Sequence, residues 1–423
     1  MRLLVVTTGY PRFEGDLAGT FVARWCEALA ARGHALLVVA PADGQAQALS
    51  ASGSASASGS GSGSASASSG SGSASASASG SASGSGAAHA SGGVVTVTRF
   101  RYALRPRLCY GAGLPDNVRD ARAVVQLPAL VAAMSGAAVR AARRFRPDVV
   151  ASHWVGPATL AGQLAAKACG ARHVAVLHSE GPKRAWLAAA LADRVVAVSA
   201  AAGSACAVVP LGVDVGPLPA RDEARAALGV GDGAYVVLAL GRLVPVKGFD
   251  VLLAAAPRGT VVRLAGDGPA RAALELAAGA ARARGVDARL VGTVLGARKG
   301  ALLAAADVLA VPSRVETLFG GGAPPWLART EGLPIVVREG QAAGLPVVAS
   351  AVGGIPAAVS HGGDAWLVPP GDAGALRDAL VALRDDPARR ARLAAGARAR
   401  AAADGLGWDR VAARWESVLM EAA

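Results

Sequence analysis

The stretch EGLPIVVREGQAAGLPVVAS, residues 331–350, combines a loop, the start of a helix and a buried strand in direct succession. Glu331 and Glu339 stand eight positions apart within it. Eight positions correspond to about two turns of an α-helix, so we expect the two carboxylates to face the same way. The stretch therefore predicts an α/β unit in which one carboxylate lies at a helix N-terminus and the other lies two turns deeper along one ligand.

The alternation of strands and helices continues on both sides of this stretch. Apolar runs predict strands at 2–7, 35–40, 94–99, 148–152, 173–178, 194–199, 235–240, 260–265, 288–292, 307–311, 346–350 and 365–368. Thr20–Arg32 is expected to be a helix that stops at Gly33, and 117–146 one or two helices interrupted near Pro128. Continuously apolar strands between helices are typical of parallel sheets covered on both faces. We therefore predict an α/β fold with doubly wound parallel sheets.

The pattern divides into two Rossmann-like domains with a cleft between them. The first spans 1–213 and contains an almost pure Ser/Ala/Gly stretch at 45–92, expected to be a flexible insertion. The second spans 214–404, and the turn-rich stretch 211–234 is expected to connect the two. The remaining residues, 405–423, are expected to form a helix that crosses back to the first domain. Ligands of such sheets bind at the carboxyl ends of the strands.

Composition and charge narrow the class of protein. The chain has 423 residues, a formal net charge of +13 and few aromatic residues, at 4%. There are two explanations for the positive charge. It is either a compositional bias on a solvated surface, without a function, or it serves to attract anions such as nucleotide phosphates and anionic lipid. Basic blocks with interleaved aromatic residues are absent, which argues against nucleic acid as a partner. The four cysteines show no metal-ligand spacing, and the N-terminus is typical of a first strand rather than a signal peptide. These features favour a cytoplasmic protein.

The stretch GRLVPVKGFDVLLAA, residues 241–255, contains the second candidate motif. It follows a predicted strand, so Arg242 and Lys247 are expected at the carboxyl end of that strand. An arginine fork and a compact lysine charge suit a diphosphate. The alternative is that both are solvated loop cations. Lysine is scarce in this chain, occurring only at positions 167, 183, 247 and 299, which makes Lys247 more informative.

Several stretches together resemble glycosyltransferase family 4, the retaining enzymes of GT-B architecture. In the C-terminal half these are GRLVPVKGFDVLLAA, AGDGPARAALE, ADVLAVPSR and EGLPIVVREGQAAGLPVVASAVGGIPAAV, in this order. In the N-terminal half they are GYPRFEGDLAGTFVARWCEALAARGHALLVVAP, RPDVVASHW, DRVVAVS and VVPLGVD. The resemblance covers most of the chain apart from the Ser/Ala/Gly stretch, and it implies two Rossmann-like domains of GT-B type.

The resemblance implies roles for individual residues of the C-terminal half. Arg242 and Lys247 would hold the donor's pyrophosphate and stabilise charge on the departing nucleoside diphosphate. Glu331 would contact the donor sugar near its reacting carbon, so these three residues are the expected catalytic set. Glu339 would accept hydrogen bonds from the ribose hydroxyls. Fixed cations on the leaving diphosphate and a carboxylate near the positively charged sugar ring lower the barrier to transfer.

Further residues are implied around this centre. The backbone amides of Gly332 and Leu333, at a helix start, would add to the phosphate and sugar cradle. In the first domain, Gly15 or Gly19 would let the backbone approach the donor or acceptor closely. His178, in VLHSEG, would line the sugar pocket, although a histidine at a strand end is often structural. No D-x-D stretch occurs in the chain, so neither a metal nor any other cofactor is expected.

The stretch 312–334 is longer than the corresponding stretch usually is in this family, and it leaves two questions open. Glu316, in PSRVETLFG, also resembles the family's strand-to-loop glutamate, but Glu331 has the expected spacing to Glu339. The extra Gly/Pro-rich stretch, which carries Trp326, is either a lid over the donor or a surface insertion.

The implied activity is that of a retaining glycosyltransferase. It would move a hexose from a nucleotide diphosphate sugar to a glycan, a lipid-linked saccharide or a small alcohol, in cell-surface polysaccharide or glycolipid biosynthesis. The alternatives are a non-catalytic nucleotide-sugar-binding subunit and a related GT-B enzyme such as an epimerase or a phosphorylase. A further hypothesis is peripheral contact with anionic lipid at the inner face of the cell membrane, through the basic surface and the arginine-containing helix near 140–146.

Overall fold

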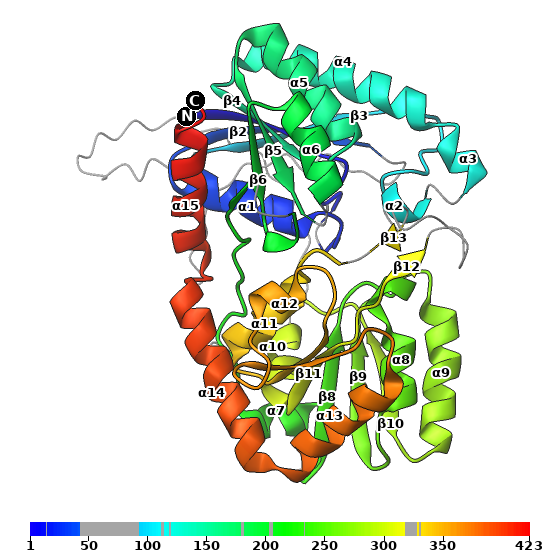
Figure 1. The fold of residues 1–423 in the computed structure, drawn as a ribbon. Helices are drawn as coiled ribbons and strands as arrows, with labels where there is room; N and C mark the ends of the chain where they lie inside the picture. Colours follow the sequence, from blue (N-terminus) through cyan, green and yellow to red (C-terminus); the bar gives the residue numbers. More distant parts are fainter. Residues whose placement is uncertain are drawn as a thin grey trace, which may run out of the picture.

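Two parallel β-sheets, one above the other in Figure 1, organise the chain. The computed structural model describes residues 1–13, 15–42, 93–110, 114–117, 120–178, 182–202, 206–231, 233–317, 328–329 and 331–423. The predicted insertion at 45–92 lies outside these residues. The predicted α/β class with doubly wound parallel sheets is confirmed.

The first sheet has the strand order β3-β2-β1-β4-β5-β6-β7 and is parallel throughout the described pairs. Its strands are β1 (Arg2–Val6), β2 (Ala35–Pro41), β3 (Val95–Phe100), β4 (Val149–His153), β5 (Arg172–Leu177), β6 (Arg194–Ala197) and β7 (Ala207–Val208). The side chains of β1 alternate between the two faces, as expected of a strand. Leu3 and Val5 join one core cluster, and Leu4 and Val6 join the other. All four are fully buried, so both faces are covered.

Helices cover these two faces. On one face lie α1 (Thr20–Ala31) and α15 (Trp408–Met420), whose apolar sides share the cluster of Leu3. On the other lie α4 (Leu127–Phe145) and α5 (Pro157–Cys169), which share the cluster of Leu4. The remaining helices of this half are α2 (Leu114–Asn117), α3 (Ala121–Val124), α6 (Pro182–Leu191) and the short 3₁₀-helix η1 (Ala200–Ala202).

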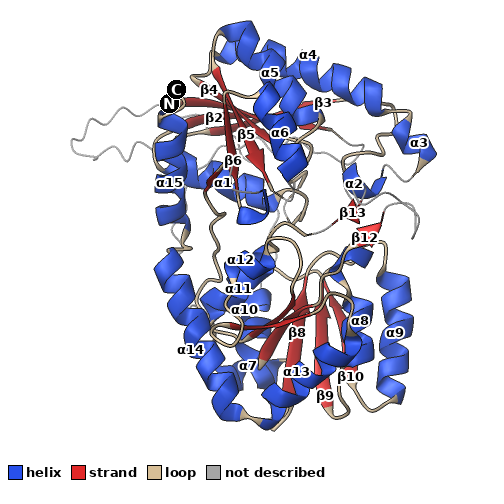
Figure 2. Ribbon diagram, in the orientation of Figure 1, coloured by secondary structure: helices blue, strands red, loops and turns tan. Residues whose placement is uncertain are grey.

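The second sheet has the strand order β10-β9-β8-β11-β14-β15 and is also parallel. Its strands are β8 (Tyr235–Leu240), β9 (Thr260–Ala265), β10 (Asp287–Gly292), β11 (Val308–Val311), β14 (Val347–Ser350) and β15 (Ala365–Val368). One face is covered by α8 (Phe249–Ala255), α9 (Arg271–Ala283) and α13 (Ala373–Asp385). The other is covered by α10 (Gly296–Ala305), α11 (Ile335–Ala343) and α12 (Ile355–Ala358). Figure 2 shows these layers in helix and strand colours.

The end of the chain runs alongside both sheets. Helix α14 (Pro387–Asp404) packs against α11, and α15 packs against α1. Trp415 is buried against Trp25, with ring centroids 5.6 Å apart, and its indole N–H donates to the carbonyl of Pro210. The two termini therefore lie side by side in Figure 1.

One local expectation is confirmed and one is wrong in its details. The helical stretch is interrupted at 125–126, just before Pro128, which lies in the first turn of α4. A proline is tolerated there because the first backbone N–H groups of a helix have no partner within it. The expected connection 211–234 contains helix α7 (Arg221–Ala227), whose Arg225 is buried against the second sheet. A buried ion pair with Asp307, which composition does not reveal, holds this helix in place.

Candidate active site

The loop that follows β8 contains the predicted pair of cations. Arg242 comes directly after Gly241, and Lys247 ends the 3₁₀-helix η2 (Pro245–Lys247). Gly248 is the N-cap residue of α8 and has a positive φ of 64°, and a Cβ at this position would overlap the carbonyl oxygen of Pro312. The glycine therefore lets the loop press against the residues that follow β11. This contact fixes Lys247 at the carboxyl end of the second sheet, as predicted.

Lys247 and Glu331 lie together. The Lys247 Nζ is 3.0 Å from Glu331 Oε1, and both side chains are about five-sixths buried, with 16% and 15% exposed. The backbone of Glu331 is fixed as well, because a Cβ on Gly353 would overlap the Glu331 carbonyl. The next residue, Gly332, accepts a hydrogen bond from the Gly354 amide. Two residues that sequence reasoning proposed from separate motifs are thus brought into one ion pair.

The expected helical relation between the two glutamates is wrong. Helix α11 begins at Ile335 with Pro334 as its N-cap residue, so Glu331 lies in the preceding loop. Proline disfavours helical backbone in the residue before it, which here is Leu333. Gly332 and Leu333 consequently precede the cap rather than form the first turn. The side chain of Leu333 packs partly buried against the apolar cluster beneath α11.

Glu339 lies on α11 and is buried, with 9% of the residue exposed. Its Oε1 accepts a hydrogen bond of 2.8 Å from the Nζ of Lys299, which comes from α10. Sequence reasoning missed Lys299. The only signal available in the sequence was the scarcity of lysine, which occurs four times in the chain.

The two glycines predicted in the first domain lie in the loop between β1 and α1. Gly19 caps α1 with a positive φ of 67°, and a Cβ there would overlap the carbonyl of Gly9. Gly15 also has a positive φ, of 85°, but a Cβ at that position would meet nothing within 4 Å. Gly19 is therefore required by close packing of the loop, whereas Gly15 is required only by its backbone angle.

His178 follows β5 directly and is buried. Its Nε2 is 2.9 Å from Nδ1 of His153, the last residue of β4. The rings of Phe21 and Trp154 each lie 4.9 Å from the His178 ring, between centroids. Burial and the neighbouring His153 lower the pKa of His178 well below its ordinary value, and burial lowers that of His153 to about 3. Both imidazoles are therefore neutral at pH 7.

The neutral histidine pair predicts acid sensitivity. The pKa values are lowered on folding, so below about pH 6.5 the unfolded chain takes up protons that the folded chain does not bind. The stability contributed by the pair is present above pH 6.5 and is lost as the pH falls. We expect His153→Gln to reduce the slope of unfolding free energy against pH between about 6.5 and 5, by up to ~1.4 kcal/mol per pH unit. Denaturant titrations measure this slope. The exposed His361→Gln is the control, and equal slopes in wild type and His153→Gln would contradict the prediction.

Glu316, the alternative sugar-contacting residue, lies on the short strand β12 (Glu316–Thr317). That strand pairs antiparallel with β13 (Ala328–Arg329).

Most of the stretch proposed as a lid, including Trp326, lies outside the described residues. Within the described residues, no group of three or more His, Cys, Asp or Glu side chains is arranged to hold a metal ion.

The ends of the two sheets meet next to the Lys247–Glu331 pair. A Cβ on Gly354, which precedes α12, would lie 3.0 Å from the hydroxyl of Ser199, which follows β6. Two parallel-sheet domains apposed in this way define the GT-B class. The family model described as "Glycosyltransferase Family 4" matches residues 88–215, and the one described as "Glycosyl transferases group 1" matches residues 220–400. The chain belongs to glycosyltransferase family 4, as its motifs indicated.

Curated relatives are named as glycosyltransferases. A D-inositol 3-phosphate glycosyltransferase of Thermomonospora curvata is 38% identical over 206 residues, 44% of this chain and 43% of the relative. One of Catenulispora acidiphila is 33% identical over 291 residues, 62% of this chain and 61% of the relative. A GDP-mannose-dependent monoacylated α-(1-6)-phosphatidylinositol monomannoside mannosyltransferase of Corynebacterium glutamicum is 34% identical over 223 residues, covering 50% and 55%. The matches thus span about half the length of these relatives.

Solved structures share the fold over the whole chain. HepE of Anabaena in complex with UDP has a TM-score of 0.65 at 19% identity, with both chains covered completely. The sucrose-phosphate synthase of Thermosynechococcus elongatus has a TM-score of 0.69 at 19% identity, with 99% and 98% covered.

Proposed function

We propose that this protein is a retaining glycosyltransferase that moves a hexose from a nucleotide diphosphate sugar to a hydroxyl acceptor. The observation that carries the proposal is the buried Lys247–Glu331 ion pair at the carboxyl end of the second sheet, with Glu339 on the helix that follows. Membership of glycosyltransferase family 4 supports it.

In this proposal Arg242 and Lys247 bind the diphosphate. Without donor, Glu331 neutralises Lys247. An incoming diphosphate offers Lys247 a stronger anionic partner, which frees Glu331 to face the sugar ring as positive charge develops on it. The two fixed cations supply the charge that the leaving nucleoside diphosphate requires, so we propose that no metal is needed.

Glu339 and Lys299 would bind the ribose. Lys299 occupies Oε1 of Glu339, and the same contact orients the carboxylate so that Oε2 can accept from ribose hydroxyls. Gly332 and Leu333 would contribute backbone amides to the donor site. His178, with Gly15 and Gly19, would line the sugar and acceptor side.

The acceptor belongs to the same proposal. The named relatives act on inositol phosphate or on a phosphatidylinositol mannoside, which supports a glycan, lipid-linked saccharide or small alcohol as acceptor.

We propose a cytoplasmic protein in peripheral contact with anionic lipid. The helical stretch Arg122–Phe145, which includes most of α3 and all of α4, is long and apolar enough to cross a membrane, with 28% of its most apolar window buried, but a core helix passes the same test. The net charge of +13 favours contact with the surface of an anionic membrane.

Two measurements on the purified chain test the proposal. A thermal-shift panel with UDP, GDP and ADP should raise Tm for one base, because a ligand at about 100 times its Kd stabilises by roughly 2.7 kcal/mol. The matching nucleotide sugar should then release free nucleoside diphosphate. No shift with any nucleotide would contradict the donor site. Tight binding without turnover under any acceptor would instead indicate a non-catalytic binding subunit.

A further inference from the structure

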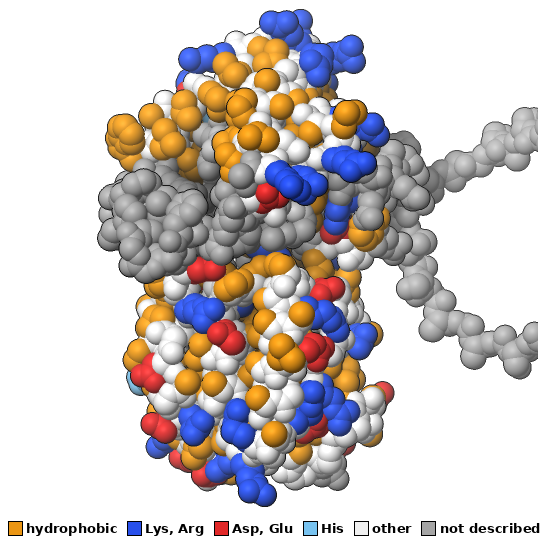
Figure 3. Space-filling view, turned by 90° about the vertical axis from the view of Figure 1, so that its right-hand side faces the viewer, with side chains coloured by type: hydrophobic (Ala, Val, Ile, Leu, Met, Phe, Trp, Pro, Cys, Tyr) orange, Lys and Arg blue, Asp and Glu red, His pale blue; other side chains and the backbone are white. Residues whose placement is uncertain are grey.

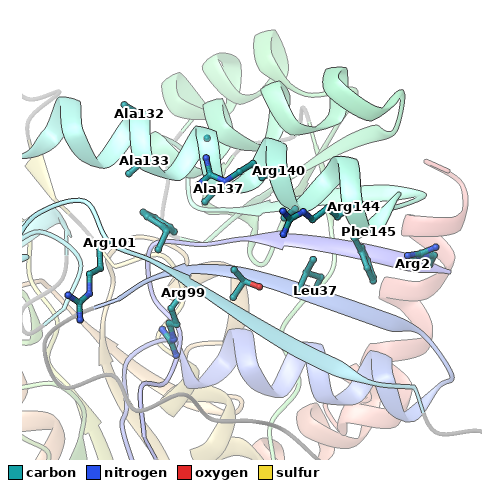
Figure 4. Close-up of a pocket in the computed structure, with 14 residues that line it drawn as sticks. Arg2, Leu37, Arg99, Arg101, Ala132, Ala133, Ala137, Arg140, Arg144 and Phe145 are labelled. Carbon is teal, nitrogen blue, oxygen red and sulfur yellow. The ribbon is translucent and has the colours of Figure 1, made fainter.

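A groove of about 550 Å³ lies between α4 and the edge of the first sheet. It exists because β3 is the outer strand of the described sheet, whereas α4 packs mainly over its neighbours. The side of α4 that faces the groove carries small residues, Ala133, Gly136, Ala137 and Ala141, so the space above β3 stays open. Leu37, Thr98 and Phe100 also line it. Figure 4 shows the helix above and the strands below.

Arginines of α4 form the wall of this groove. Arg140 and Arg144 lie one turn apart, and in Figure 4 both side chains run back along α4, above the strands. Arg101, at the carboxyl end of β3, and Arg2, stacked on Phe145 at 4.6 Å, line its two ends. No aspartate or glutamate is among the lining residues. The groove is therefore a region of uncompensated positive charge.

The two arginines of α4 that line the groove are exposed and differ in this from the molecule's buried arginines. The buried guanidinium groups of Arg225 and Arg263 pair with Asp307 and Asp287. Among the described residues, neither Arg140 nor Arg144 has an ion-pair partner. In Figure 3, basic side chains gather at the upper end of the molecule, where few acidic ones are visible. Guanidinium groups gathered without counter-charge repel one another, and an anion would relieve that repulsion.

Ordinary structural causes explain only part of the cluster. Arg144 lies in the last turn of α4, where a cation complements the helix dipole. Arg99 lines the groove but is committed elsewhere, since it donates to Tyr110 and to the carbonyl of Pro41. Neither cause applies to Arg140. Its Nη1 lies 3.2 Å from the position that a Cβ on Gly136 would occupy, so the missing side chain makes room for this guanidinium.

We propose that the groove is a binding site for a phosphate ester. Arg140 and Arg144 would bind the phosphate oxygens as planar forks, and the hydroxyl of Thr98 would donate a further hydrogen bond. A groove of this volume is larger than a phosphate group. The rest, lined by alanines, Leu37 and Phe100, would accept an uncharged or apolar body. A lipid head group and a soluble phosphate ester share this chemistry.

The test measures binding without any nucleotide sugar, so it is independent of the transfer reaction. Calorimetry with glycerol 3-phosphate reports the soluble source. Sedimentation with phosphatidylcholine vesicles, with and without phosphatidylglycerol, reports the lipid source. We expect the wild type to bind at least one of the two and Arg140→Ala/Arg144→Ala to bind it on the order of 100-fold more weakly, from about tenfold per arginine. If glycerol 3-phosphate displaces vesicles, both sources share the groove.

The matched control is Arg143→Ala/Arg392→Ala, which removes the same charge from exposed positions outside the groove lining. It should bind as the wild type does. Gly136→Leu keeps every charge but fills both the groove and the space that the Arg140 guanidinium occupies, so it should also abolish binding; leucine favours helix, so the variant should fold. Equal weakening in the charge control and the groove variant would overturn the proposal, as would failure of the wild type to bind either source.

Discussion

Replacing Lys247 by alanine is expected to lower kcat about 10²–10³-fold, the range found when one preorganised charge or donor is removed from a transition state. Lys247 is held at the carboxyl end of β8, five-sixths buried and within 3.0 Å of Glu331. In the proposed donor site, this fixed charge lies where the leaving diphosphate becomes more negative. Release of nucleoside diphosphate from the donor sugar, measured under saturating donor, checks the prediction.

Two further variants separate charge from packing at this position. Lys247→Arg keeps the charge and should lose less activity than Lys247→Ala. Lys167→Ala removes an exposed lysine from the last turn of α5 and should leave kcat unchanged. If Lys247→Ala keeps wild-type kcat, Lys247 is not part of the catalytic machinery.

Replacing Asp307 by alanine is expected to lower the free energy of unfolding by about 3–5 kcal/mol, the range for breaking a buried ion pair. Asp307 accepts from the Nη2 atoms of Arg225 and Arg221 at 2.8 and 2.6 Å, and from the Val236 amide at 2.8 Å. The Arg225 side chain is only 3% exposed, so its charge would lose its carboxylate partner away from water and keep only the carbonyl acceptors of Ala305, Gly231 and Ala234.

Denaturant titration measures this loss. Asp385→Ala is the control, because Asp385 pairs with its neighbour Arg384 on the surface and its removal should leave the unfolding midpoint unchanged. A loss below about 1 kcal/mol in Asp307→Ala would show that water or a rearranged carbonyl replaces the carboxylate.

The sheets could be predicted closely because their strands are buried on both faces. Strands 235–240 and 365–368 agree with β8 and β15 in both bounds. Such strands are continuous apolar runs, and that pattern is local. The pair β12 and β13 was not predicted, since two-residue strands carry no periodicity.

Within the candidate site, the sequence indicated most of the residues but not which side chains pair with one another. Glu331, Glu339 and Lys247 were proposed from motifs. Their pairing was not, because Lys247 reaches Glu331 across 84 positions of sequence and Lys299 reaches Glu339 across 40. Contacts between loops that follow different strands leave no repeat in the sequence.

The sequence by itself determined the α/β class, the two parallel sheets and membership of glycosyltransferase family 4. The fold class, the sheets and the family membership can be recognised from apolar periodicity and short motifs, because both of these are local features of the sequence. Only the tertiary structure decided that Lys299 holds Glu339, that Glu331 lies in a loop before α11, and that Arg140 and Arg144 line one groove with β3. Each of these depends on how distant segments pack, since packing brings together side chains that the order of residues keeps apart.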